Sequence, residues 1–526
     1  MMKLLPLMIV AAGLSALPDE SAASVVPLTW TPCASAVDVP AQVAARTWCA
    51  MLMVPRDYAN PSGGTVALDV VRVDAAGMNG GLHQGTLLLE PGEFADTPHR
   101  EIPAMAAAWL TGGDAWRSVS RSLDLVGLAQ RRMDDADGHD CVSATSALPR
   151  HASLGAMPTG PNFVTAEALA RAIATACQND PMHAHIGASA RIKDMDKLRE
   201  ALGESRLHLV GVGRGGWIAT RFAERYPDSV GRVLLDSTWD IDGSVVEAME
   251  ARVEERGRTI RRNIATVTDA PERFGWGTEP MDIQRRIGAL PRWAREAWAG
   301  RVANVPDLLA VLAMARLLER DAALTVDGLR AALTTTRLSG SDDDNQAARE
   351  SAGKLLDEVA TGLGTDTYGF GTRAAGSSPA QIASVFATRC NDGSWGTKQR
   401  YWRQRTHELR DAWPSSVGNE TFQGMVCSTW PAAFGQSEVP VLAPSVSILM
   451  AHAEFDDEAP LRHAVLGLHG HVTARMVVAR GLRAHGMAIR SDRPCVSEVT
   501  GRFLAEGILP ANKLTNCAMP DPVSVP

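Results

Sequence analysis

The 526-residue chain has few aromatic residues, 5% of the total, and no stripe of basic residues with aromatics between them. Its formal net charge of -8 is modest for this length. Because nucleic-acid binding needs clustered positive charge, we do not expect nucleic acid as a partner. Internal repeats and low-complexity tracts are absent too, and 45% of the residues are hydrophobic. These features exclude a disordered chain and permit a large folded core.

Long apolar segments are also missing. The apolar run at 4–17 is shorter than the roughly 20 residues of a membrane-spanning helix, and no later stretch is long and apolar enough to span. Lys3 precedes this run and small residues at 21–23 follow it, which is the pattern of a cleaved signal peptide. We expect residues 1–23 to be removed and the chain to be exported to the periplasm or secreted, without membrane attachment. A membrane anchor is the alternative.

Zinc-site patterns are absent as well. There is no CxxC pair and no cluster of His and Cys in the sequence, so we expect no metal site and no cofactor. Eight cysteines in an exported chain instead indicate disulfides, although eight cysteines allow about 105 pairings. They fall into four groups of two along the chain, Cys33 with Cys49, Cys141 with Cys177, Cys390 with Cys427, and Cys495 with Cys517.

Apolar stretches of strand length alternate with helical periodicity in the first and last thirds of the chain. Strand candidates lie at 65–73, 85–92, 122–128, 207–212, 230–237, 445–450 and 474–479. Helix candidates lie at 163–177, 194–202 and 461–468, with a terminal helix at 496–507 that we expect to close the domain. This alternation predicts an α/β fold, with a mostly parallel sheet covered by helices on both faces.

The middle of the chain has a different pattern. Amphipathic helical stretches follow one another after residue 243 without a convincing strand. We interpret residues 243–380 as a helical cap inserted between a first core part, 24–242, and a second core part, 381–526. Such an insertion lies over the carboxyl ends of the strands, where ligands bind, and acts as a lid.

The chain is organised around the stretch at 207–217. An apolar strand runs there into Gly211-Val212-Gly213-Arg214-Gly215 and then into a helix. This spacing matches G-x-S-x-G, the turn that holds the nucleophilic serine of α/β-hydrolases. The central residue is Gly213, which has no hydroxyl. The sequence therefore predicts the α/β-hydrolase fold, but it lacks the hydroxyl that would act as the nucleophile at this turn.

Two further residues occupy the positions of a catalytic acid and base. Asp456 follows the penultimate predicted strand, and His485 follows the last one, in the chain order of this fold. Asp456 would orient the imidazole, and His485 would act as the base. The alternatives are a solvated turn for Asp456 and an exposed loop for His485.

Several sequence blocks resemble the exported α/β-hydrolases of the tripeptidyl aminopeptidase and proline iminopeptidase type, which have a TAP-like C-terminal region. These blocks cover nearly the whole mature chain and lie at 30–33, 54–58, 201–203, 225–227, 230–236, 389–392, 427–431 and 507–510. The resemblance implies a relative of peptidases that release residues from free peptide N-termini. It also implies Asp456 and His485 as the acid and base, and disulfides between the cysteines of each neighbouring group.

Three motifs depart from the family pattern. Gly213 stands in place of the serine. Glu90-Pro91-Gly92-Glu93-Phe94 replaces a glycine-rich oxyanion loop, and Ala-Gln-Arg-Arg at 129–132 replaces D-x-R-G. A carboxylate of Glu90 or Glu93 would oppose an oxyanion, where donors normally contribute about 3–4 kcal/mol. Arg214 is a cation where the family has a neutral residue, and it faces either the pocket or solvent.

Three functions remain open from the sequence. The first is a non-catalytic protein that binds a peptide or small molecule in a capped pocket. The second is an active hydrolase in which His485 activates water, or which uses a nucleophile elsewhere. The third is a non-hydrolytic enzyme in which His485 transfers a proton. Acidic residues of the cap, Glu254, Glu255 and those at 342–344, either recognise a peptide amino terminus or form a solvated helix face. The sequence does not fix the oligomeric state.

Overall fold

The computed structural model describes most of the mature chain. The described residues are 27–33, 39–77, 83–91, 98–132, 141, 143–144, 159–298, 302–360, 379–396, 398–410, 418–430, 442–488 and 493–518. The expected signal peptide at 1–23 lies outside them, as do Gly92 and Glu93 of the expected oxyanion loop.

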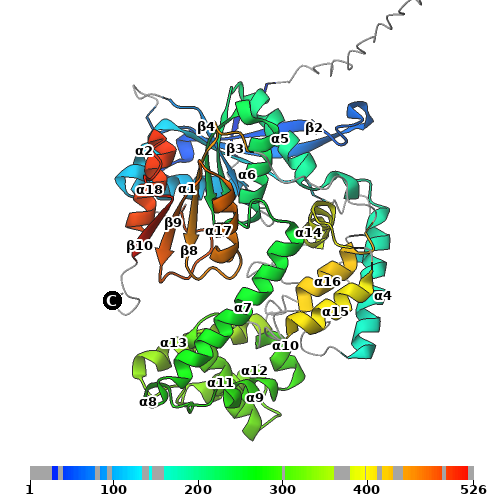
Figure 1. Ribbon diagram of the computed structural model, residues 1–526, viewed down its shortest axis with the longest axis vertical. Coiled ribbons are helices and arrows are strands. Elements are labelled where there is room, and N and C mark those ends of the chain that lie inside the picture. The colour runs from blue at the N-terminus through cyan, green and yellow to red at the C-terminus, as the bar shows by residue number, and fades with distance from the viewer. Residues whose placement is uncertain are drawn as a thin grey trace, which may run out of the picture.

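The described strands form one sheet in the order β1-β2-β3-β5-β4-β6-β7-β8-β9-β10 (Figure 1). The pairs β1–β2, β2–β3 and β3–β5 are antiparallel, and every pair from β5 to β10 is parallel. The strands are β1 Thr31–Pro32, β2 Thr47–Pro55, β3 Thr65–Val73, β4 Thr86–Glu90, β5 Asp124–Leu128, β6 Leu207–Val212, β7 Val230–Asp236, β8 Ser447–Ala453, β9 Arg475–Arg480 and β10 Leu514–Ala518.

The burial of each strand follows from its residue pattern. All residues of β4 are buried, as are all but the first of β8, because these apolar runs lie between two helical layers. The outer strand β2 alternates instead, with Leu52 and Val54 buried and Met51 and Met53 exposed. The continuous apolar runs therefore give the parallel centre of the sheet, and alternation gives its antiparallel side.

Helices cover both faces of this sheet. Residues of α1, α2 and α18 pack on one face, and residues of α5, α6 and α17 pack on the other. The helices are α1 Pro98–Thr111, α2 Asp114–Ser122, α4 Gly160–Gln178, α5 Ala188–Leu202, α6 Arg214–Arg225, α7 Val245–Thr268, α8 Pro271–Phe274, α9 Pro280–Gly288, α10 Arg292–Trp298, α11 Val305–Arg320, α12 Val326–Leu333, α13 Asp342–Ala360, α14 Pro379–Asp392, α15 Gln399–Arg410, α16 Gly418–Cys427, α17 Leu461–Gly470 and α18 Pro494–Glu506.

A helical lobe, α8 to α13, lies to one side of the sheet and is joined to it by the long helix α7 (Figure 1). The first half of α7 packs in the main core through Val245 and Met249. Its second half packs through Ile260 and Ile264 in a separate apolar core that also contains Leu312. Because α7 belongs to both cores, it sets the position of the lobe relative to the sheet.

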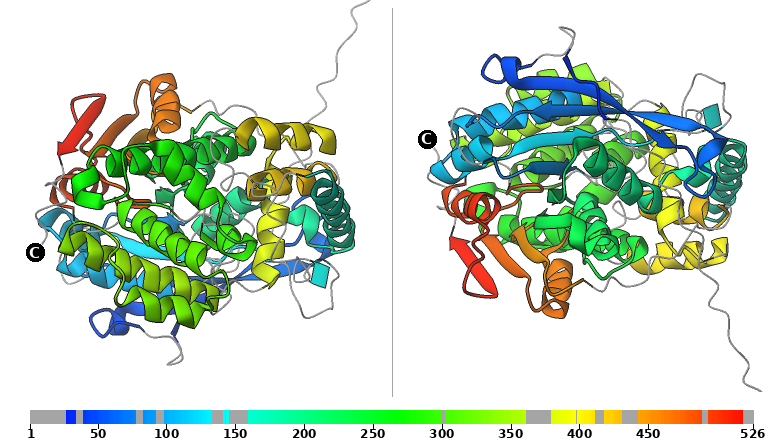
Figure 2. Two further views of the ribbon diagram at one scale, coloured as in Figure 1. Left: turned by 90° about the horizontal axis from the view of Figure 1, so that it is seen from below. Right: turned by 90° about the horizontal axis from the view of Figure 1, so that it is seen from above.

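The helices α14, α15 and α16 follow the lobe and lie beside α4 (Figures 1 and 2). Among the described residues, no strand occurs between Asp236 and Ser447. Helices therefore continue past residue 380 as far as Cys427. The division of the chain at 242 and 380 into core and cap stays a prediction.

All four disulfides implied by the family resemblance are present. They join Cys33 to Cys49, Cys141 to Cys177, Cys390 to Cys427, and Cys495 to Cys517. Among the helices described, none combines the length and the apolar character that crossing a bilayer requires.

The predicted α/β-hydrolase fold is confirmed, and its strand candidates correspond to β3 to β9. The prediction that a terminal helix closes the domain is wrong. The strand β10 follows α18 and pairs in parallel with β9. The alternation in β10 is weak because it is an edge strand with exposed residues such as Leu514.

The passage from β6 to α6 requires glycine at position 211, which gives a test of the fold. A Cβ atom at Gly211 would lie 2.4 Å from the Gly215 carbonyl oxygen. We expect Gly211→Ala to lower the free energy of unfolding by about 1–3 kcal/mol, since backbone atoms must move. Gly353→Ala is the control, because Gly353 lies in α13 with open space around it. That control is expected to be neutral or stabilising by about 0.5–1 kcal/mol. Equal effects in urea unfolding would contradict this packing.

Candidate functional site

The turn from β6 to α6 has the shape of a nucleophile elbow. Gly213 lies at its tip with φ 56° and ψ -121°. For any other residue this conformation would cost about 1–3 kcal/mol of stability, whereas glycine adopts it freely. The N–H of Gly213 donates to the Asp236 carbonyl at 3.0 Å, and its carbonyl accepts from Gly216 N–H at 3.1 Å. The elbow is therefore formed and held without a side chain at its tip.

Asp456 and His485 lie side by side on the loops that follow β8 and β9. His485 Nδ1 is 3.0 Å from Asp456 Oδ2 and 3.2 Å from Oδ1. Oδ1 also accepts the N–H groups of Glu458 and Ala459, at 3.0 and 2.9 Å. Asp456 is only 1% exposed. The alternative of a solvated turn at Asp456 is therefore wrong, because the carboxylate is buried and fixed against the imidazole.

The three predicted positions meet at one place. A Cβ atom built on Gly213 would lie 3.0 Å from His485 Nε2 and 3.3 Å from Cε1. With a shift of a few tenths of an ångström in the ring, a serine hydroxyl at this position would come within hydrogen-bond reach of Nε2. The structure therefore holds the acid and the base of a triad around an empty nucleophile position.

The loop that carries His485 is anchored to the end of β7. The N–H groups of Met487 and Ala488 donate to the Asp236 carboxylate at 3.1 and 2.7 Å, and Gly486 N–H donates to Ser237 Oγ at 3.0 Å. Ser237 has φ 52° and is the single non-glycine residue with positive φ in the described part of the chain. Such a conformation costs about 1–3 kcal/mol. The sequence pattern gave no signal for these anchoring residues.

The charge state of His485 follows from its neighbours. The His485 side chain is 37% exposed, on a loop that is open to solvent on one side. Its partial burial lowers its pKa, but the Asp456 carboxylate, by its charge and its hydrogen bond, raises it. Glu458 and Asp236 act in the same direction, and the pKa of His485 is raised to about 9. At neutral pH the ring is therefore a cation that donates hydrogen bonds and accepts none.

A partly buried network of charges joins the cap to this site. Arg256 contacts Glu458 at 2.5 Å and Glu420 at 3.1 Å, and Arg252 contacts Glu458 at 3.1 Å. Although burial of Glu458 acts in the opposite direction, the two arginines hold its pKa well below the usual range. Because α7 supplies both arginines and α16 supplies Glu420, this network holds two helices against the Asp456 loop. Sequence reasoning missed it, since its members are far apart in the chain.

Arg214, the first residue of α6, points into the protein. It is 4% exposed and forms an ion pair with Asp392, the last residue of α14. Its guanidinium also lies over the ring of Trp217, 5.9 Å from the centroid. The alternative in which Arg214 faces solvent is wrong.

Glu90 is fully buried at the end of β4, where it pairs with Arg191 of α5. Its Oε2 lies 2.8 Å from Arg191 Nε and 2.7 Å from Nη2. Arg191 also donates to the carbonyls of Leu128 and Ala129, each at 2.8 Å. The charge of Glu90 is thus balanced inside the protein and is not an unpaired charge beside the elbow. Pro91 directly follows it, half-buried.

Arg131, in the altered motif at 129–132, fixes the neighbouring loops. It holds Asp194 through two bonds of 2.7 and 2.8 Å and donates to the carbonyls of Pro55 and Arg56. Tyr58 donates its hydroxyl to the same carboxylate at 2.7 Å. Burial and this carboxylate raise the pKa of Tyr58, so it remains a donor. Arg131 therefore has a structural role.

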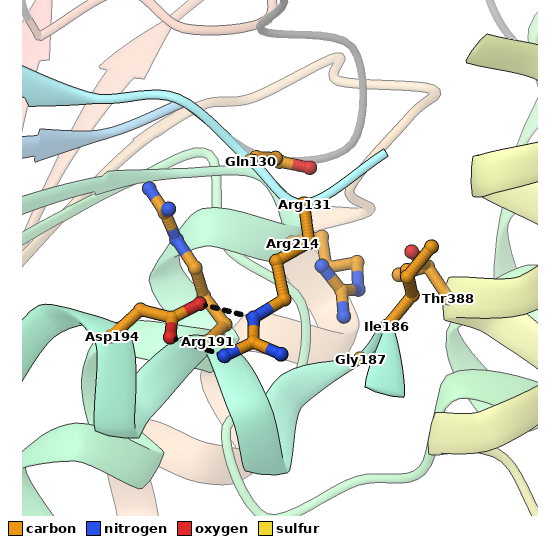
Figure 3. A pocket seen from close by; sticks show the side chains of 8 residues that line it. All are labelled: Gln130, Arg131, Ile186, Gly187, Arg191, Asp194, Arg214 and Thr388. Atoms are coloured by element: carbon orange, nitrogen blue, oxygen red, sulfur yellow. Dashed lines mark hydrogen bonds and ion pairs between the residues drawn. The ribbon is translucent and has the colours of Figure 1, made fainter. Parts of the chain in front are cut away.

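These arginines line a small pocket (Figure 3). Each of its three lining arginines is paired with a carboxylate, so the lining carries no excess positive charge. The lining residues are Gln130, Arg131, Ile186, Gly187, Arg191, Asp194, Arg214 and Thr388. Two of the three altered motifs thus contribute directly to one polar pocket beside the elbow.

The acidic residues of the cap divide into two groups: Glu254 and Glu255 lie near an arginine of the core, whereas Asp342 and Asp343 are exposed, as expected of a solvated helix face. Glu254 pairs with Arg462 of α17 at 2.9 Å, and the carboxylate of the buried Glu255 lies 3.6 Å from the same arginine. The aspartates at 342–344 occupy the first turn of α13, where negative charge stabilises a helix, and the last of them pairs with Arg273 at 2.7 Å. Glu254 and Glu255 therefore dock α7 onto the core.

A second histidine lies close to the acid–base pair. His452, on β8, is 0% exposed, and neither ring nitrogen has a hydrogen-bond partner among the described residues. Burial lowers its pKa to about 4, with Asp456 acting in the opposite direction and His485 in the same one. Sequence reasoning missed His452 because it lies within the apolar run of β8.

Two family models and several known proteins match this chain. The family model described as alpha/beta hydrolase fold matches residues 185–315, and the model described as TAP-like protein matches 414–517. The chain is similar to the tripeptidyl aminopeptidase of Streptomyces lividans, at 24% identity over 509 residues that cover 93% of this chain and 86% of the relative. It is also similar to serine protease Hip1 of Mycobacterium tuberculosis, at 27% identity over 42% of this chain and 41% of that protein. Among solved structures, an acetylester hydrolase from Corynebacterium glutamicum aligns with a TM-score of 0.36 and 11% identity, covering 89% of this chain and 99% of that one.

The charge of His485 can be measured directly. We expect its ring to titrate near pH 9 in NMR spectra, and Asp456→Asn to lower that pKa toward the ordinary value of about 6.5. Because the folded pKa exceeds the unfolded one, the pair stabilises the fold fully below about pH 6.5. That stabilisation is lost as the pH rises through about 9. Asp457→Asn, which changes charge beside Arg483, is the control. An unchanged His485 titration in Asp456→Asn would contradict the pairing.

His452 gives a test in acid. Its folded pKa of about 4 lies below the unfolded value of about 6.5. The unfolded chain therefore takes up a proton first, and stability falls by up to about 3 kcal/mol as the pH drops from 6.5 to 4. We expect His452→Leu to reduce this loss in unfolding measured across that range. The same substitution at exposed His469 is the control. Equal pH dependence in His452→Leu and the unchanged protein would show that the buried ring takes no part.

Proposed function

We propose that this chain, an α/β-hydrolase-fold protein with a TAP-like region and serine aminopeptidase relatives, binds a peptide or small anionic ligand without serine-peptidase activity. The binding site is the space between Gly213 and the Asp456–His485 pair. The ligand group that fits it best is a carboxylate, such as the one that peptide hydrolysis produces.

One observation carries this proposal. Gly213 has no side chain at the point, 3.0 Å from His485 Nε2, where the Cβ atom of a nucleophilic residue would lie. The acid and the base nevertheless remain paired. Without a hydroxyl or thiol at 213, no acyl-enzyme forms there, and loss of a triad serine costs roughly a million-fold in turnover.

The charge of the site supports a ligand with an oxyanion. His485 is protonated at neutral pH and donates from Nε2 toward the empty position. The N-terminus of α6 begins at the same turn, and helix N-termini favour negative charge. A carboxylate there would replace the missing serine as the partner of the imidazole.

The same pKa argues against direct activation of water by His485. With its pKa raised to about 9, the ring is mostly protonated at pH 7, and a protonated ring cannot accept a proton from water. Ser237 lies beside the His485 loop, but it is fully buried and accepts a bond from Gly486, so it anchors the loop rather than offering a nucleophile.

We also propose that the protein is exported from the cytosol. Four disulfides fit an oxidising compartment outside the cytosol. The signal-peptide pattern at 1–23 directs the chain there, to the periplasm or beyond.

Restoring the nucleophile tests whether the rest of the site remains competent. We expect Gly213→Ser to gain slow hydrolysis of peptide p-nitroanilides with a free amino terminus, at a cost of about 1–3 kcal/mol in stability from the strained backbone. Gly213→Ala is the matched control, because it adds the same Cβ and strain without a hydroxyl. Hydrolysis by the unchanged protein at the rate of Gly213→Ser would show that catalysis does not depend on position 213.

A further inference from the structure

A second group of reactive side chains lies at the edge of the sheet formed by β1 and β2. The Cys33–Cys49 disulfide joins these strands, and His99, at the start of α1, places Nδ1 3.3 Å from Cys49 Sγ. The other ring nitrogen, Nε2, lies 3.4 Å from Asp69 Oδ2 of β3. The two sulfurs and a histidine nitrogen all lie within 4.8 Å of one another.

This disulfide is more accessible than Cys141–Cys177 and Cys390–Cys427, and it has a histidine beside it. Both of its cysteines are partly exposed. Cys141 and Cys177 are fully buried, and Cys390 and Cys427 are buried. In the fourth disulfide Cys495 is exposed and its partner Cys517 is buried.

The neighbour of the Cys390–Cys427 disulfide is the amide of Gln423, 3.0 Å from Cys427 Sγ. An amide donates a hydrogen bond but gives up no proton, whereas an imidazole does both. Access and chemistry therefore distinguish Cys33–Cys49 from the disulfides in the core.

We propose that Cys33, Cys49 and His99 form a redox-gated binding site for a soft divalent ion such as Zn²⁺. The disulfide closes the site, and reduction by a dithiol opens it. The expectation of no metal site rested on cysteine spacing in the sequence, and His99 lies 50 residues from Cys49.

The opening step is an ordinary exchange of thiol and disulfide. A thiolate of the dithiol bonds to Cys33 Sγ, and the Cys33–Cys49 bond breaks. Cys49 leaves with the electron pair as a thiolate, which the His99 ring stabilises by a hydrogen bond or protonates. The second thiolate of the dithiol then displaces Cys33 and closes a cyclic disulfide. Two electrons pass to the cysteines, and the two protons of the dithiol go to the ring, the thiolates or water.

The open site has the donors that zinc prefers. Two thiolates and one imidazole are common zinc ligands, and a tetrahedral site places such atoms about 3.5–3.8 Å apart. The present separations, within 4.8 Å, need only small side-chain rotations once the sulfurs part. Asp69 already holds the far nitrogen of His99, which is how carboxylates orient zinc-binding imidazoles. Water would fill the fourth position.

Limited reduction of the mature full-length protein tests the first step. We expect brief treatment with dithiothreitol, followed by alkylation and peptide mass spectrometry, to modify Cys33 and Cys49 at least about tenfold faster than the buried Cys390 and Cys427. His99→Gln is expected to slow the reduction of Cys33–Cys49 and to leave Cys495–Cys517 unchanged. Reduction of Cys33–Cys49 and Cys390–Cys427 at one rate, or an unchanged rate for Cys33–Cys49 in His99→Gln, would overturn the gating.

Zinc binding to this partly reduced protein tests the second step. We expect one Zn²⁺ per chain in competition with a chromophoric chelator, and none in the oxidised protein. His99→Gln and Asp69→Asn should each weaken binding about tenfold or more, while His469→Gln, at an exposed histidine of α17, should not. Equal zinc affinity in the reduced unchanged protein and in reduced His99→Gln would overturn the site. None of these measurements depends on the ligand of the Gly213 site.

Discussion

The hydrogen bonds of Asp236 fix the position of the elbow relative to the loop that carries His485. Its carbonyl fixes the amide of Gly213, and its carboxylate fixes the amides of Met487 and Ala488 beyond His485. A buried carboxylate with these bonds is costly to move, because each lost bond leaves a polar group unpaired. The elbow and the imidazole therefore keep their separation although one of them no longer carries a reactive group. Ser237, strained at φ 52°, extends the same anchor to Gly486.

Much of the fold could be predicted because its signals are local. The strand β3 appears as an alternating pattern and the strands β4 to β9 as apolar runs, and the glycines of the elbow mark its tight turn. The acid and the base could be placed because the fold dictates their order after the late strands. The terminal strand β10 could not, since it is short, exposed and stabilised by pairing with β9.

The residues that balance charge could not be predicted in this way. From the sequence, Glu90 is expected to oppose an oxyanion. In the structure it pairs with Arg191, which lies 101 residues away in the chain. Arg214 likewise finds Asp392 at a distance of 178 residues. Such pairs depend on how α5, α6 and α14 pack, which no local pattern records. The altered motifs therefore describe a pocket rebuilt around paired charges, in which the absent serine is one change among several.

The central claim is that the native protein has no nucleophile in an otherwise assembled triad. The most direct measurement is the intact mass of the unchanged mature protein after exposure to a fluorophosphonate, which bonds to activated serines. The account predicts no added mass in the unchanged protein and in Gly213→Ala, and one adduct at position 213 in Gly213→Ser. An adduct on any serine of the unchanged protein would contradict it.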